Sequence, residues 1–135
     1  AMYEEKTWDH VLQVNLHAPW LLTRACLPVL VKAPAASVLF TTSDVARRGH
    51  AYWGAYAGAG AALENLVQVW TDELSANSPI RMNTLDPGAV RSALRARAYP
   101  GENPLTLPAP ESVMPLYLYL MGADSKEIRG QALCA

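Results

Sequence analysis

The chain has 135 residues, of which 51% are apolar and 17% are charged, and its formal net charge is −1 at pH 7. This balance predicts one globular domain with a sizeable core and excludes a disordered chain. Acidic and basic residues are interspersed, so neither a nucleic-acid partner nor a membrane-surface partner is expected. The sequence shows no signal-peptide pattern and no apolar run of about 18 residues that would predict a membrane span.

The two cysteines, Cys26 and Cys134, are far apart in the sequence and have apolar neighbours. Isolated cysteines in such surroundings predict buried thiols, which favours a reducing, cytoplasmic location. His10, His17 and His50 are scattered without a cluster of further ligands, so we predict no metal site.

The first predicted element is a long helix over residues 3–32, because apolar residues recur there at helical spacing. Pro19 and Pro28 each lack a backbone donor, so we expect a kink or a break near each of them. Asn15 is polar on an otherwise apolar stretch. From the residues alone we interpret Asn15 as a core-edge side chain that bonds a neighbouring backbone group.

The middle of the chain predicts a strand at 37–42, a helix at 56–76 and a second strand at 80–85, which together form a βαβ unit with parallel strands. Ser43 follows the first strand, and Tyr56 begins the helix. A hydroxyl and a phenol are therefore expected at the carboxyl edge of the sheet, where open α/β folds bind ligands.

After a turn at 86–88, residues 89–110 are predicted to be irregular, with one short helix near 92–98. A further helix is expected at 111–121, with Pro115 in its first turn, and a last strand at 130–134. The predicted fold is three-layer α/β: a Rossmann-like partial parallel sheet, the C-terminal half of a doubly wound fold. One edge of this sheet should be unpaired and apolar unless a partner covers it.

Ser43 precedes Tyr56 by thirteen residues, the sequence Leu-Phe-Thr-Thr leads into the serine, and Trp-Gly-Ala leads into the tyrosine. With Asn83 and Pro-Gly following in order, the segment resembles the active-site region of the short-chain dehydrogenase/reductase family. The resemblance covers essentially the whole chain and implies that residues 1–135 are a single truncated Rossmann-like domain.

The resemblance implies an NAD(P)-dependent oxidoreductase that acts on an alcohol or a carbonyl. In such enzymes the tyrosine exchanges a proton with the substrate oxygen and the serine steadies that oxygen, roles that fall on Tyr56 and Ser43. Val-Asn-Leu, 28 residues before the serine, resembles the fourth active-site position and marks Asn15. Pro87, Gly88 and Ser92 match the family's loop against the nicotinamide, which implies contact with NAD or NADP, and residues 91–104 match the mobile lid over the substrate.

The chain departs from the family pattern at Gly60, where the family has a lysine four residues after the tyrosine. That lysine stabilises the phenolate and holds the nicotinamide ribose, and no lysine occurs here between Lys32 and Lys126. The family's cofactor loop also precedes the segment present in this sequence. Arg47, Arg48 and His50 in the preceding loop could bring a charge near Tyr56, but we favour the interpretation of a solvated basic loop. The alternative hypothesis is therefore a non-catalytic, degenerate relative that serves as an oligomerisation or binding module and binds no cofactor.

The resemblance further implies a homo-oligomer in which helices 3–32 and 56–76 pack against the same pair of a second subunit. Trp8, Trp20 and Trp70 offer aromatic area for such an interface. The expected partners are thus a second copy of the chain and, in an active enzyme, a small alcohol or carbonyl substrate.

Overall fold

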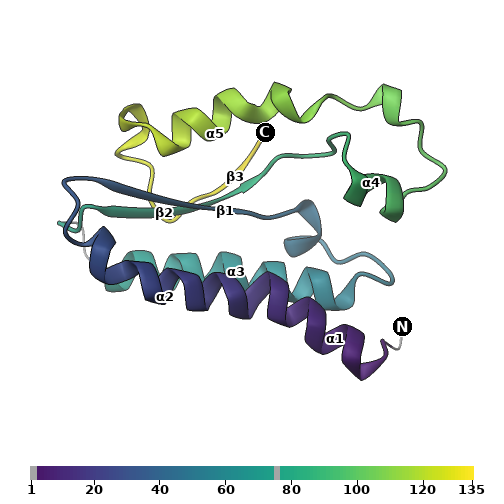
Figure 1. Ribbon diagram of the computed structural model, residues 1–135, viewed down its shortest axis with the longest axis horizontal. Helices are drawn as coiled ribbons and strands as arrows, with labels where there is room; N and C mark the ends of the chain where they lie inside the picture. The colour runs from purple at the N-terminus through teal and green to yellow at the C-terminus, as the bar shows by residue number, and fades with distance from the viewer. Residues whose placement is uncertain (1–2, 75–76) are drawn as a thin grey trace.

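The computed structural model describes residues 3–74 and 77–135. At its centre is a parallel sheet of order β1-β2-β3, and its helices lie in a layer on each face of this sheet (Figure 1). The strands are β1 (Ala36–Thr41), β2 (Ile80–Asp86) and β3 (Ala132–Cys134). On one face lie α1 (Glu5–Leu12), α2 (Ala18–Leu30) and α3 (Gly54–Glu73), and on the other lies α5 (Met114–Met121). The predicted three-layer α/β fold is confirmed.

The central strand, β2, is buried along its whole length because it has a strand on each side and helices on both faces. Thr41 of β1 is paired with Leu85, and Leu85 is paired in turn with Leu133 of β3. The main hydrophobic core lies between the sheet and the layer of α2 and α3. Its buried members are Ala36, Val67, Ile80 and Met82.

The predicted helix 3–32 is helical from Glu5 to Leu30, with a π-helical segment at Gln13–His17 between α1 and α2. In this segment the N–H of Ala18 bonds the carbonyl of Gln13, five residues back. Pro19 has no N–H to donate to the carbonyl of Asn15, so the regular α-helical hydrogen bonding is interrupted in the turn before this proline. The helix continues through Pro28, so no break occurs there.

The other predicted elements are found within a few residues of their predicted positions, including a short α4 (Ala93–Ala98) and an α5 that carries Pro115 in its first turn. Positions 75–76 of the predicted helix 56–76 lie outside the described residues. Within the described part of the chain, no helix is both long enough and apolar enough to span a membrane.

The prediction that both cysteines are buried is wrong, because Cys26 and Cys134 are exposed. Cys134 belongs to β3, which forms one edge of the sheet. Cys26 lies on α2 and lines an apolar groove of about 600 Å³ between α2 and β1, the strand at the other edge. Each cysteine thus lies beside an edge of the sheet where the described residues place no further strand, and this leaves its thiol accessible.

The free edge of β1 agrees with the predicted open, apolar edge. The N–H groups of Ala36 and Thr42 donate to carbonyls of the β2 segment at 2.9 and 2.8 Å. Because successive residues of a strand alternate in direction, the N–H groups of Ser37, Leu39 and Thr41 point away from β2. Beside them, Leu22 of α2 is 67% exposed at the apolar groove.

Candidate active site

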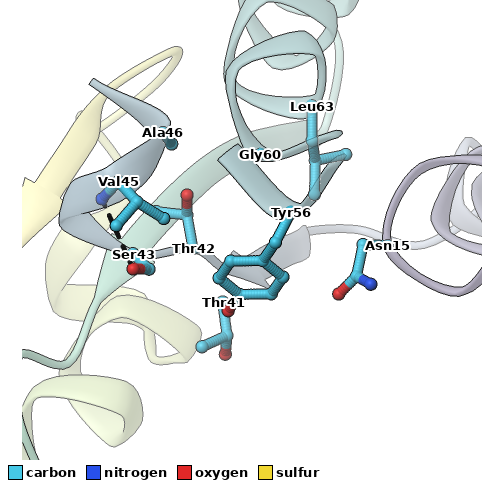
Figure 2. A pocket seen from close by; sticks show the side chains of 9 residues that line it. All are labelled: Asn15, Thr41, Thr42, Ser43, Val45, Ala46, Tyr56, Gly60 and Leu63. Atoms are coloured by element: carbon cyan, nitrogen blue, oxygen red, sulfur yellow. Dashed lines mark hydrogen bonds between the residues drawn. The ribbon is translucent and has the colours of Figure 1, made fainter. Parts of the chain in front are cut away.

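The three side chains predicted to be catalytic meet at one small cavity at the carboxyl edge of the sheet (Figure 2). Ser43 follows β1, Tyr56 is in the first turn of α3, and Asn15 comes from the π-helical segment. The cavity has a volume of about 20 Å³, which is room for about one water molecule. Its lining residues are Asn15, Thr41, Thr42, Ser43, Val45, Ala46, Tyr56, Gly60 and Leu63.

Ser43 is held by local hydrogen bonds at the start of a short 3-10 helix, Asp44–Ala46. Its Oγ donates to Asp44 Oδ1 at 3.1 Å and accepts a long bond from the N–H of Val45 at 3.5 Å. A serine at the start of a helical turn commonly makes such a cap. The cap fixes the hydroxyl beside the cavity.

Tyr56 is half-buried, and the ring of Trp53 meets its own ring edge-on with 5.8 Å between the centroids. Burial raises the pKa of the Tyr56 phenol above its ordinary value of 10.0, and the carboxylates of Asp86 and Asp44 raise it further. Proton exchange by a tyrosine near neutral pH is favoured by a lowered pKa. The electrostatic surroundings of Tyr56 thus act against ionisation, and position 60, one turn further along α3, carries no charge.

Asn15 lies on the side of the Tyr56 ring away from Ser43 (Figure 2). Its Nδ2 donates to the carbonyl of Val11, one turn earlier in the same helix, at 2.9 Å. The interpretation of Asn15 as a core-edge residue bonded to neighbouring backbone is confirmed, and the same side chain also lines the cavity.

Pro87, Gly88 and Ser92 lie beyond the end of β2 and do not line this cavity. The N–H of Thr42 donates to the carbonyl of Leu85, so β1 and β2 are still paired where they end. The segments that follow the two strands therefore begin side by side. Gly88 has a φ of +69°, a conformation that favours glycine, and its N–H donates to Asp86 Oδ1 at 2.9 Å. A Cβ added at Gly88 would meet nothing within 4 Å, so the face of this turn is open to a planar group. Ser92 accepts a bond from the N–H of Arg95 at 3.1 Å and caps α4.

An ion network behind the site was not predicted. Arg47 Nη1 lies 2.9 Å from Glu64 Oε1, and Arg47 Nη2 lies 2.8 Å from Asp86 Oδ2. Thr42 Oγ1 donates to Glu64 Oε1 at 3.0 Å. Arg47 is exposed, as expected for a solvated loop, but its guanidinium is also paired with two nearly buried carboxylates, which was not predicted. One signal was available, because Glu64 lies between Leu63 and Val67 on the apolar face of α3, where a charge requires a buried partner.

The segment that resembles a lid is joined to Tyr56 through aromatic rings. The guanidinium of Arg95 lies 3.7 Å from the ring centroid of Tyr99, and Tyr99 stacks on Trp53 with centroids 5.9 Å apart. Arg95 also bonds both carboxylate oxygens of Glu102, at 2.7 and 2.9 Å. These contacts hold α4 against the loop that precedes α3 and form an aromatic wall beside Tyr56. Among the residues that the structure describes, no three His, Cys, Asp or Glu side chains gather to hold a metal ion.

A parallel sheet with helices on both faces, and a serine, a tyrosine and an asparagine around a cavity at its carboxyl edge, places the protein in the class of Rossmann-like α/β folds. The family model described as short chain dehydrogenase matches residues 1–103. The chain belongs to the short-chain dehydrogenase family.

Among curated relatives, "Uncharacterized oxidoreductase YciK" of Escherichia coli K12 is 45% identical over 130 residues, which cover 96% of this chain and 51% of that protein. A Pseudomonas syringae structure described as a short chain dehydrogenase is 50% identical, with a TM-score of 0.93, over 97% of this chain and 53% of that one. A structure of a short chain dehydrogenase from Escherichia coli CFT073, complexed with NADPH, is 44% identical with a TM-score of 0.92, over 97% of this chain and 54% of that one. The chain thus spans about half the length of these relatives.

Proposed function

We propose that this chain forms the catalytic half of an NADP(H)-dependent oxidoreductase that interconverts an alcohol and a carbonyl. The observation that carries the proposal is the convergence of Asn15, Ser43 and Tyr56 on one cavity at the carboxyl edge of the sheet. The NADPH complex of the Escherichia coli relative supports the choice of cofactor.

In this proposal Tyr56 Oη exchanges a proton with the substrate oxygen, and Ser43 Oγ donates a hydrogen bond to the same oxygen in place of Asp44. Pro87 and Gly88 hold the nicotinamide end of the cofactor against their open turn, with the Ser92 hydroxyl beside it. A bound nicotinamide supplies or accepts the hydride. Substrate enters next to the aromatic wall of Trp53 and Tyr99.

The free edge of β1 and the groove beside α2 suit the part of the fold that the relatives have beyond the matched half. A parallel strand added at β1 would satisfy its free N–H groups, and helices packed behind it would cover the apolar groove. We propose that the dinucleotide-binding half of the fold packs there. Cofactor binding then depends on that half.

A second candidate function is a non-catalytic binding or oligomerisation module. Gly60 favours it, since no cation stands one turn after Tyr56, and so does the raised pKa of the Tyr56 phenol. In this case the cavity residues keep their places but no hydride transfer takes place.

NADPH fluorescence titration and carbonyl reduction separate the two candidates. Both are measured on this chain alone and on this chain fused behind the N-terminal half of the NADPH-bound Escherichia coli relative. We expect no micromolar NADPH binding by the chain alone, and both binding and slow reduction by the fusion. Loss of reduction in the fusion carrying Tyr56→Phe, with NADPH binding retained, supports the oxidoreductase. A fusion that binds NADPH but reduces no carbonyl supports the non-catalytic module.

A further inference from the structure

A side chain at position 60, one turn after Tyr56, would press against Ala46. A Cβ built on Gly60 would lie 3.0 Å from Ala46 Cβ, 3.6 Å from Ala46 Cα and 3.7 Å from Thr42 Oγ1. Ala46 ends the short 3-10 helix that follows Ser43, and Figure 2 shows it facing α3 near Gly60. By contrast, a Cβ at Gly58 of the same helix would meet nothing within 4 Å.

We propose that Ala46 is a positioning residue for the Tyr56 site, because its methyl group decides whether residue 60 can carry a cationic side chain. With alanine at 46, a side chain at residue 60 has to displace the Ala46 methyl group. With glycine at 46, the space opens for a lysine to stand beside Tyr56. This inference rests on the proposed function, because it concerns the tyrosine to which we assign proton exchange.

Ala46 cannot easily move away from α3, because its turn is anchored on both sides. Its N–H donates to the carbonyl of Ser43 at 3.0 Å, and the preceding residue, Val45, is buried. The next residue, Arg47, is tied to Glu64 and to Asp86 by its guanidinium. Extra methyl groups are destabilising where the neighbours cannot relax. The contact at residue 60 is therefore expected to outweigh the preference of a helix for alanine over glycine.

A lysine at position 60 would lie on the same helix face as Tyr56, since residues four apart are neighbours on a helix. The charged groups around this face are Asp44, Asp86, Glu64 and Arg47. Glu64 and Asp86 already bond Arg47, and Asp44 accepts from Ser43. A lysine ammonium there would add a positive charge beside these carboxylates and the Tyr56 phenol, and such a cation lowers a phenol pKa.

The steric part of the proposal is tested by thermal unfolding of four variants. Gly58→Ala, the matched control, should raise the midpoint by about 3 °C because alanine favours the helix. Gly60→Ala should instead lower the midpoint. In the Ala46→Gly background, Gly60→Ala should raise the midpoint as Gly58→Ala does. A native-background Gly60→Ala that is as stabilising as Gly58→Ala would overturn the proposal.

The electrostatic part is tested by ultraviolet titration of tyrosinate, with the Tyr56 contribution obtained by subtracting the same variant carrying Tyr56→Phe. We expect Ala46→Gly/Gly60→Lys to lower the Tyr56 midpoint by about 1–3 pH units, and Ala46→Gly/Gly60→Met, of similar bulk, to leave it unchanged. An equal shift in Gly60→Lys alone overturns the role of Ala46, as does an unshifted midpoint in the double variant. Single-variant Gly60→Lys that fails to fold while the double variant folds supports it. Neither experiment uses cofactor or turnover, so a negative result for the role of Ala46 can be told apart from a failure of the proposed function.

Discussion

Replacing Arg47 with methionine tests whether the ion network behind the site stabilises the fold. The carboxylates of Glu64 and Asp86 are only 9% and 10% exposed, whereas the Arg47 side chain is 34% exposed. Removing one partner of a buried pair costs about 3–5 kcal/mol, and an exposed pair is worth at most about 1 kcal/mol. Arg47 is partly exposed and its two partners are nearly buried, so the cost of removing it should lie between these two values. We expect Arg47→Met to lower the free energy of unfolding by about 2–3 kcal/mol.

Urea unfolding followed by far-ultraviolet circular dichroism measures this loss, which corresponds to a fall of about 1–2 M in the midpoint. Arg48→Met is the matched control, because the neighbouring Arg48 is also exposed but takes part in none of the ion pairs found among the described residues. This variant should change the free energy of unfolding by no more than about 0.5 kcal/mol. Glu64→Gln combined with Arg47→Met should lose less than the two single variants added together, since they share one interaction. A loss for Arg47→Met that equals that of Arg48→Met would show that solvent already screens the network.

Three further predictions concern the phenol, a turn and the assembly. The pKa of Tyr56 is raised in the folded protein, so the stability that depends on this phenol is fully present below pH 10 and falls as the pH rises through the folded pKa. In urea unfolding between pH 9 and about 11, Tyr56→Phe should therefore lose less stability than the native chain. Equal losses would contradict the shift. Gly130→Ala should destabilise by about 1–2 kcal/mol in the same assay, because Gly130 has a φ of +63° and its Cβ would lie 3.1 Å from Thr71 Cγ2; an unchanged midpoint would show that the turn relaxes. The sequence leads us to propose a homo-oligomer through α1–α2 and α3. Leu21→Glu on the exposed side of α2 should then shift light scattering toward monomer, whereas Leu105→Glu, in the short 3-10 helix Pro104–Thr106, should not. A native monomer would refute the interface.

The sequence alone determined the fold class and pointed to three of the residues that line the cavity, Asn15, Ser43 and Tyr56. Short β-rich runs and helical periodicity depend on neighbours along the chain, so the strands and helices were predictable within a few residues. Ser43 and Tyr56 were found because each lies at the end of a regular element, and the carboxyl ends of parallel strands share one edge. Asn15 was marked differently, by the resemblance of Val-Asn-Leu to a family position, while its bond to Val11 is local to the helix.

Only the tertiary structure decided what surrounds these residues. The pairing of Arg47 with Glu64 and Asp86 joins a loop, a helix and a strand end that are 17 and 39 residues apart from the arginine. Likewise, the exposed cysteines depend on which strands lie at the sheet edges. The close approach of Ala46 to Gly60 depends on how a turn packs on a helix. Such contacts are set by packing in three dimensions, which residue spacing along a chain does not encode.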